Sequence, residues 1–268
     1  MHRRWKNTAS VSLYMSGEDT AVRSITILGV RVDVLTWEMF DGCVAEFVAS
    51  GTPHQAVTVN PEFIMAAQRN AAFRRVLNQA DLALADGWGV QAAARLLGQR
   101  LPVRVTGADG VPRLAALAAA RGWRLYLLGA VPGVAVRAAQ VLQARHPALH
   151  VVGTYAGSPH PADEDLIAEQ ITAAQPDILF VAYGAPAQDL WIARNQERLR
   201  IPFAMGVGGA LDFVAGVRRR APRWVQRAHL EWLYRLLQEP WRWRRQLALP
   251  RFAAAVLGQA WRERQRGR

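Results

Sequence analysis

The chain has 268 residues, enough to bury a full hydrophobic core as one large domain or as a domain with an appendage. Its single cysteine, Cys43, excludes a disulfide framework and a cysteine-based metal site, and no run of about 18 apolar residues suggests a transmembrane helix. The net charge of +12 is concentrated at one end, because residues 218–268 hold 14 arginines and only three acidic residues. We expect a flexible leader over 1–20, a near-neutral body over 21–217 and a cationic appendage over 218–268 that meets a polyanionic partner.

The first half of the chain alternates short apolar runs with helical patterns. Residues 25–34 predict an opening strand or hairpin, and Thr36 is a typical N-cap for a helix that ends near residue 49. The pattern then predicts strands at 55–59 and 81–85, helices at 61–79 and 90–97, a linking stretch at 102–109, and a helix at 111–120.

The second half of the chain repeats this alternation more regularly. Strands are expected at 123–128, 150–152, 177–182 and 201–205, with helices between them that end near residues 146, 174 and 199. Short strands alternating with helices predict an α/β fold, Rossmann-like, with a mainly parallel sheet and helices on both faces. In the appendage, apolar residues at helical spacing predict one helix over 225–237 that Pro240 breaks, and a further amphipathic piece that Pro250 breaks.

Glycines and polar residues follow the predicted strands, at the sheet edge where such folds bind ligands. These strand-end residues are Thr58, Asn60, Asp86, Gly129, Gly153, Tyr183, Gly184, Gly206, Gly208 and Gly209. Glycine turns that lead into helices favour phosphate, because free N–H groups and the helix dipole attract anions. The pattern therefore predicts a nucleotide or phosphate binder, although it contains neither a Walker A motif nor a dinucleotide fingerprint. Asp86 is placed either for chemistry or to cap the helix that follows it.

Three patterns favour structural roles over catalysis. Asp163-Glu164-Asp165 matches the Asp-x-Asp pattern with which sugar transferases hold a metal, but it opens a helix, where acidic residues are stabilised by the dipole. The six histidines are scattered along the chain, so we expect no metal site, and we expect no cofactor. Ser158 lacks a nucleophile elbow, which argues against a serine hydrolase.

Tryptophan and arginine are concentrated in the appendage, where five of the ten tryptophans lie between residues 224 and 261. Tryptophan rings sit at headgroup level and guanidinium groups bind lipid phosphates, so an anionic membrane surface is the favoured partner. Alternatively, the apolar face packs on the body and the arginines are solvated. We do not expect nucleic acid as a partner, because none of its binding motifs is present. A homo-oligomer would be another way to cover the apolar face.

Seven motifs occur in order between about residues 25 and 251. They are Thr58-x-Asn60, Asp86-Gly-x-Gly89, Arg104-x-x-Gly-x-Asp109, Gly184-x-Pro-x-Gln-Asp-x-Trp191, Gly206-Val-Gly-Gly-x-x-Asp-x-x-x-Gly216, Arg220-Ala-Pro, and Glu231-Trp-Leu-Tyr-Arg-Leu-Leu-x-Glu-Pro240. In this combination the chain resembles the WecG/TagA/CpsF family of glycosyltransferases (glycosyltransferase family 26).

The resemblance implies an inverting, metal-independent enzyme with a Rossmann-like body and a C-terminal appendage. Such an enzyme moves a sugar of the N-acetylmannosamine, N-acetylmannosaminuronic acid or glucose type from a UDP-sugar donor to a polyprenyl-pyrophosphate-linked sugar acceptor. It would work peripherally at the cytoplasmic face of the bacterial plasma membrane, in cell-surface polysaccharide synthesis. The alternative is a non-catalytic scaffold that binds a nucleotide sugar.

The resemblance also implies roles for individual residues. Asp86 matches the proposed general base, Thr58 and Asn60 match positions that line the sugar pocket, and Arg104 matches a position thought to neutralise the donor diphosphate. Trp88 fills a slot often held by a smaller aliphatic residue, which would reshape the acceptor pocket.

Further positions are expected around the nucleotide. Tyr183, Gln188 and Asp212 match positions near it, and Asp212 would accept hydrogen bonds from ribose hydroxyls. The strand-end glycines expected to contact the substrate are Gly129, Gly184, Gly208 and Gly209. In the appendage, Arg235, Arg242 and Arg245 match arginines thought to complete the active site at the membrane.

Overall fold

The computed structural model describes residues 22–240 and 243–266, so the expected leader over 1–20 and Arg242 lie outside the described residues. The main sheet of the described part has six strands: β3 (His54–Val59), β4 (Leu82–Ala85), β5 (Arg124–Gly129), β6 (His150–Tyr155), β7 (Ile178–Ala182) and β8 (Phe203–Gly206). All are parallel, in the order β4-β3-β8-β7-β5-β6. This confirms the predicted α/β class, and it makes β4 an edge strand.

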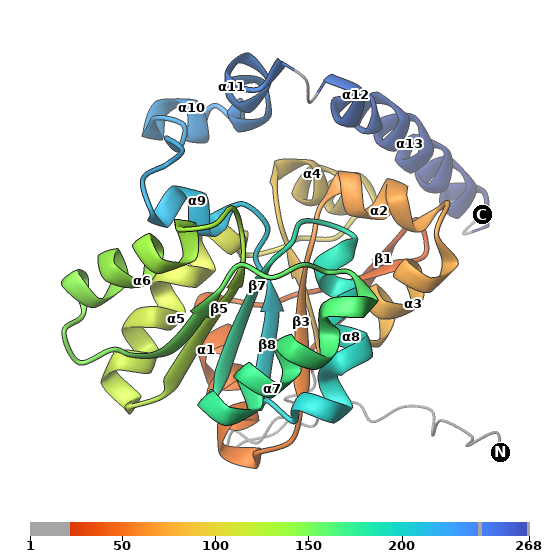
Figure 1. Cartoon of the computed structure of the whole chain (residues 1–268). Helices are drawn as coiled ribbons and strands as arrows, with labels where there is room; N and C mark the ends of the chain where they lie inside the picture. The colour runs from red at the N-terminus through yellow and green to blue at the C-terminus, as the bar shows by residue number, and fades with distance from the viewer. Residues whose placement is uncertain (1–21, 241–242, 267–268) are drawn as a thin grey trace, which may run out of the picture.

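Helices cover both faces of the sheet (Figure 1). One face carries α1 (Trp37–Ser50), α5 (Gly107–Arg121) and α6 (Val134–Arg145), and the other carries α7 (Glu164–Ala174), preceded by the 3-10 turn η1 (Pro161–Asp163), and α8 (Ala187–Leu199). Strand β7 shows why: Ile178 and Phe180 pack into the α1/α5/α6 cluster, and Leu179 and Val181 pack into the α7/α8 cluster. Side chains alternate across a strand, so apolar runs without alternation give strands buried on both faces.

A third hydrophobic cluster lies at the β3/β4 side of the sheet. It joins these strands to α2 (Pro61–Ala67), α3 (Ala71–Gln79) and α4 (Trp88–Leu96), and to a separate hairpin of β1 (Ser24–Ile27) and β2 (Val30–Asp33). The hairpin turn is formed by Leu28 and Gly29, both with positive φ (50° and 78°), as a tight two-residue turn between twisted strands requires. The Asp33 carboxylate accepts a hydrogen bond from the Ala83 N–H at 2.7 Å, which ties the hairpin to β4.

Two element boundaries differ from the sequence-based expectation. Helix α5 begins at Gly107, because the Thr106 hydroxyl caps it by accepting from the Asp109 N–H at 3.1 Å, so the linking stretch is shorter than predicted. Strand β6 continues to Tyr155 instead of ending at Val152, because residues 153–155 pair with β5 beyond a register shift.

The appendage departs most from prediction. It contains α10 (Arg223–Arg227), α11 (Glu231–Gln238), α12 (Trp243–Gln246) and α13 (Ala248–Arg266), after α9 (Ala210–Val214). The single helix predicted over 225–237 is wrong, because His229 adopts a left-handed conformation (φ 60°) between α10 and α11. The break predicted at Pro250 is also wrong. Pro250 lies in the first turn of α13, where its missing N–H is not needed.

Helix α13 packs on the body through buried Phe252 and Val256, which join the cluster of α2 and α4. Gln259 strengthens this contact by accepting from the Leu28 N–H at 2.8 Å and donating to the Thr26 carbonyl at 3.1 Å. Figure 1 shows α10 to α13 passing as an arc over the end of the sheet at which the strands finish. The appendage therefore lies over the edge where the candidate site residues are expected.

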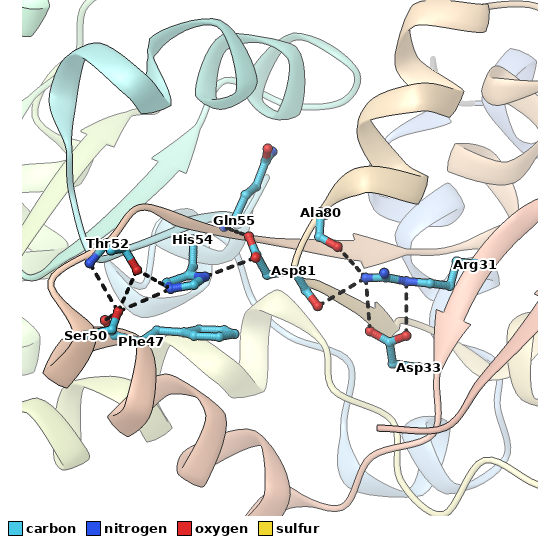
Figure 2. Close-up of polar contacts among 9 residues, drawn as sticks. All are labelled: Arg31, Asp33, Phe47, Ser50, Thr52, His54, Gln55, Ala80 and Asp81. Atoms are coloured by element: carbon cyan, nitrogen blue, oxygen red, sulfur yellow. Dashed lines mark hydrogen bonds and ion pairs between the residues drawn. The ribbon is translucent and has the colours of Figure 1, made fainter. Parts of the chain in front are cut away.

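The opposite end of the sheet holds a polar cluster around His54 and Asp81 (Figure 2). His54 Nδ1 lies 3.0 Å from Asp81 Oδ1, and its Nε2 lies 3.3 Å from the Ser50 hydroxyl. This set resembles a Ser-His-Asp triad in composition, but the Ser50 hydroxyl donates to the Phe47 carbonyl and His54 stacks on the Phe47 ring. The cluster therefore ends α1 and joins the starts of β3 and β4 instead of carrying out chemistry.

Replacing Asp81 by asparagine should lower the free energy of unfolding by about 1–2 kcal/mol. One carboxylate oxygen accepts from the Gln55 N–H at 2.8 Å and the other contacts His54, so the amide cannot serve both donors. Urea unfolding followed by circular dichroism measures the change. The matched control is Asp165→Asn, whose side chain is 92% exposed and should change stability by less than about 0.5 kcal/mol. Equal stability of the two variants would contradict this account of the cluster.

Candidate active site

Asp86 is the first residue after β4, at the carboxyl edge of the sheet. Its N–H donates to the Val59 carbonyl at 2.8 Å, which fixes the backbone against β3. The side chain is partly exposed, and Gly87 follows with φ 92°, a conformation that an L side chain rarely adopts. Asp86 makes no side-chain cap to α4, whose N-cap is Gly87, so the helix-capping interpretation is wrong. The carboxylate is left available to a ligand.

The surroundings of Asp86 tune its affinity for a proton. Removal from water raises its pKa to about 6, while the positive charges of Arg104 and Arg235 and a hydrogen bond from Asn60 act in the opposite direction. Glu231 raises the pKa further. A carboxylate of this kind is ionised at neutral pH yet basic enough to take a proton from a reacting hydroxyl.

The end of β3 brings Asn60 beside Asp86, and Thr58 lies two residues earlier in the chain, on β3. The Asn60 side chain caps α2 by accepting from the Phe63 N–H at 2.9 Å, and it also hydrogen-bonds Asp86. Thr58 is buried between β3 and β8, with its hydroxyl 3.5 Å from the Gly206 carbonyl. A Cβ at Gly89 would lie 2.7 Å from the Pro61 ring, so only glycine permits this approach of α4 to α2.

The ends of β7 and β8 are held together by Gln188. Its side-chain oxygen accepts from the Gly184 N–H at 3.1 Å and from the Gly208 N–H at 2.9 Å. Gln188 is almost fully buried, so these two hydrogen bonds fix both glycine turns in position. The N–H groups of Gly184 and Gly208 are therefore already hydrogen-bonded to the protein.

The neighbouring strand-end residues Gly129 and Tyr183 face the interior. Gly129 (φ 97°) packs directly on the Ala182 backbone, where a Cβ would lie 2.8 Å from the carbonyl carbon. The Tyr183 hydroxyl points toward Gly157, and burial raises its pKa. Both residues therefore have a packing role in this structure. The Tyr183 hydroxyl does not point toward the turns that Gln188 holds.

The charged side chains of Asp212 and Arg235 both lie beside Gly209. A Cβ built on Gly209 would lie 3.3 Å from Asp212 Oδ2 and 3.8 Å from Arg235 Nη2. The Arg235 guanidinium lies 5.4 Å from the centre of the Phe213 ring, and Arg218 lies 3.8 Å from the Asp212 carboxylate. Arg235 thus reaches from α11 in the appendage to the turn after β8.

A network of ion pairs connects the appendage to the body near Asp86. Arg104 binds Glu231 of α11 at 2.5 Å, and Arg220 pairs with Asp109 of α5 at 2.9 Å and lies 3.7 Å from Glu231. Sequence reasoning did not assign site roles to Arg220 and Glu231. The only signal was their presence in the motifs, because their partners lie more than 100 residues away.

Trp88 also connects the site to the appendage. Its ring stacks on His229 with centroids 5.5 Å apart and an interplanar angle of 22°. The Trp88 side chain is 43% exposed, so it forms part of the surface beside Asp86. Arg245 is not part of this surface. It pairs with Glu62 at the start of α2 at 2.8 Å, and both residues line a pocket there.

Comparison with known proteins decides the assignment. The model of the glycosyl transferase WecG/TagA/CpsF family matches residues 25–266. The chain belongs to this family. It is 36% identical over 200 residues to the N-acetylglucosaminyldiphosphoundecaprenol N-acetyl-beta-D-mannosaminyltransferase of Bacillus subtilis strain 168, covering 75% of this chain and 77% of that protein. It is 30% identical over 230 residues to the enzyme of the same name from Staphylococcus aureus strain MW2, covering 85% and 89%.

The WecG/TagA/CpsF glycosyltransferase uses its Asp-x-Asp pattern structurally, as predicted. Asp163 precedes α7, Glu164 pairs with Arg194 at 2.6 Å, and Asp165 pairs with Arg198 at 2.6 Å. Within the ranges that the structure describes, no group of three or more histidine, cysteine or acidic side chains is arranged to hold a metal ion. Two arginines, Arg104 and Arg235, are close enough for their charges to act on Asp86. In the described part of this glycosyltransferase we also find no helix with the length and apolar character needed to cross a membrane.

Proposed function

We propose that this glycosyltransferase moves an N-acetylmannosamine-type sugar from a UDP-sugar to a polyprenyl-diphosphate-linked sugar, with inversion and without a metal ion. The observation that carries the proposal is the carboxylate of Asp86, a partly exposed residue at a strand end, with a pKa raised to about 6 and with Arg104 and Arg235 near it. The names of the relatives support an N-acetylmannosaminyl group and a diphosphoundecaprenol-linked acceptor. N-acetylmannosaminuronic acid and glucose are the alternative donor sugars.

The reaction is a single displacement at the anomeric carbon. The acceptor hydroxyl oxygen bonds to that carbon from the face opposite the diphosphate, and Asp86 takes the hydroxyl proton as the bond forms. The bond from the anomeric carbon to the diphosphate oxygen breaks, and its electron pair leaves with UDP. Asn60 orients the carboxylate through its hydrogen bond, and Thr58 lines the floor of the sugar site.

The leaving diphosphate needs positive charge, which arginines and backbone N–H groups supply in this proposal. Arg235 is nearest to the β8 turn, and Arg104 adds charge from the β4 side. The turns that Gln188 holds would carry the diphosphate, and Asp212 would accept hydrogen bonds from the ribose. Arg242 and Arg245 remain candidates for contacts that form at the membrane.

The experiment that tests the proposal measures UDP release from a panel of UDP-sugars in EDTA, with and without a short-chain lipid-diphosphate-sugar acceptor. We expect acceptor-dependent release from one donor, which would name the sugar. Tight donor binding without turnover would instead support the alternative of a non-catalytic scaffold that binds a nucleotide sugar.

The rate should depend on pH through Asp86. Only the ionised carboxylate accepts a proton, so kcat/KM should rise between about pH 5 and 7, with a midpoint near the pKa of about 6, and level off above. UDP release at saturating donor and subsaturating acceptor measures the profile of kcat/KM for the acceptor, and circular dichroism at each pH shows that folding is retained. A rate that is flat or falls over this range would contradict the role of Asp86 as base.

We further propose that the appendage binds an anionic membrane surface at the cytoplasmic face of the bacterial plasma membrane, for a role in cell-surface polysaccharide synthesis. Large apolar side chains are exposed along it, and among the described residues they are Trp224, Leu230, Trp232, Leu237, Trp243, Leu247, Leu257 and Trp261. Flotation with vesicles should show binding that requires anionic lipid and weakens with salt. Replacing Trp224 and Trp232 by serine should reduce binding severalfold. Salt-independent self-association in gel filtration, without vesicle binding, would favour a homo-oligomer instead.

A further inference from the structure

An arginine-lined pocket lies beside the candidate active site. It has a volume of about 380 Å³, opens to solvent, and is lined by Arg104, Arg223, Gln226 and Arg227. Arg223 and Arg227 are four residues apart on α10, so their side chains lie on the same face of the helix. Every charged side chain that lines the pocket is therefore cationic.

The arginines of α10 are available to a ligand. Arg104 is held by Glu231 at 2.5 Å, but neither Arg223 nor Arg227 forms an ion pair within residues 22–240 and 243–266. Three guanidinium groups around one pocket repel one another unless an anion lies between them. Their planar forks match phosphate oxygens two at a time, so the pocket suits an anion with two phosphates better than one with a single charge.

The position of the pocket relative to β4 separates it from the donor turns. The Asp86 N–H points to β3, where it bonds to Val59, so the carbonyl of the same peptide, Ala85, points to the outer edge of the sheet. That carbonyl accepts from the Val105 N–H at 2.9 Å, which places the chain next to Arg104 on the outer side of β4. The glycine turns held by Gln188 follow β7 and β8, on the inner side.

A single displacement places the base and the leaving diphosphate on opposite sides of the anomeric carbon. The donor diphosphate belongs to the inner side, near Arg235, and Asp86 faces the acceptor. An anion pocket on the outer side of Asp86 is therefore on the side from which the acceptor arrives. The acceptor class proposed above carries a diphosphate of its own between its sugar and its lipid.

We propose that Arg223 and Arg227, together with Arg104, bind the diphosphate of the lipid-linked acceptor. The inference rests on the proposed function and deepens it, because it assigns the acceptor site to α10. A diphosphate bound there would position the acceptor sugar with its hydroxyl directed at Asp86. The lipid chain would extend from the diphosphate along the exposed apolar side of the appendage. Arg104 lies between the two diphosphates and adds positive charge to both.

The test compares two water-soluble acceptors with the same sugar and the same short chain, one linked by a diphosphate and one by a monophosphate, in the absence of membrane. We expect the wild-type protein to prefer the diphosphate. The double variant Arg223→Gln/Arg227→Gln should lose about 10- to 100-fold in kcat/KM for the diphosphate acceptor and clearly less for the monophosphate, with the KM for the donor unchanged. The matched control is Arg262→Gln/Arg266→Gln, an exposed pair with the same spacing on α13, which should change neither value.

Each other outcome overturns the inference. Equal losses with both acceptors would show that Arg223 and Arg227 do not distinguish a diphosphate from a monophosphate. A raised KM for the donor would place the donor diphosphate in the pocket. If the double variant shows no loss without membrane, and a loss appears when the assay is repeated with anionic vesicles, the pair would be assigned to lipid headgroups.

The inference is also separable from the proposed function. Titration calorimetry with the diphosphate acceptor requires no turnover. If the wild-type protein binds this acceptor but transfers no sugar, and the double variant does not bind it, the pocket is an acceptor site and the proposed function is wrong. If the affinity is the same in both proteins, the pocket assignment fails whatever the activity.

Discussion

Replacing Asp86 by asparagine should reduce kcat by about 10²- to 10⁴-fold, the usual contribution of a positioned general base. The amide has nearly the same size and keeps a hydrogen bond with Asn60, but it cannot take the proton of the acceptor hydroxyl. UDP release at saturating donor and acceptor measures the effect. Donor binding should change little, because Asp86 lies on the β4 side, away from the glycine turns held by Gln188.

Two controls make the Asp86 result specific. Asp81→Asn removes a carboxylate at the opposite end of the sheet, and it should lower stability without lowering the turnover of the folded protein. Asp86→Glu keeps an acid but moves it, and it should retain more activity than Asp86→Asn. Near-normal turnover by folded Asp86→Asn would exclude this residue as the base.

Replacing Arg235 by alanine should lower kcat by about 10²- to 10³-fold, as the loss of one preorganised charge at a leaving group does. Arg235 lies beside Gly209 and Asp212, where the donor diphosphate is proposed to bind. The loss of positive charge should also raise the pKa of Asp86, so the midpoint of the pH profile should move upward. This shift separates an electrostatic role from a purely structural one.

The matched control for Arg235 is Arg264→Ala, an exposed arginine in the last turn of α13. It removes the same charge from the appendage and should leave kcat unchanged with soluble substrates. Arg235→Lys should recover part of the activity, because the ammonium keeps the charge but loses the planar fork. Equal kinetics for the Arg235 and Arg264 variants would show that the β8 turn does not depend on an appendage arginine.

The sheet was predictable because its signal is local. Each buried strand is a short apolar run ended by glycine or a polar residue, as Ile178–Ala182 before Tyr183 and Gly184 shows. Parallel strands all end at the same edge of a sheet, so the sequence alone predicted that Thr58, Asn60 and Asp86 lie at one edge. Periodicity left open whether Asp86 is placed for chemistry or caps the next helix. The motifs of the resemblance favoured a base, and the structure excludes the cap.

The appendage was less predictable because long-range contacts determine its shape. The apolar spacing over 225–237 fits one helix, but His229 turns the chain so that its ring stacks on Trp88. The burial of Phe252 and Val256 against α2 and α4 keeps α13 helical through Pro250 at its start. The pairing of Arg104 with Glu231 across 127 residues has no local signal.

The most direct test of the central claim is the structure of the product. The purified protein is incubated in EDTA with an α-linked UDP-N-acetylmannosamine donor and the short-chain diphosphate acceptor, and the anomeric configuration of the isolated product is determined by NMR. A single displacement with Asp86 as base predicts a new β-linked N-acetylmannosaminyl group on the acceptor, in line with the linkage in the names of the relatives. An α-linked product, or a β-linked product that forms only when a divalent metal is added, would contradict the account.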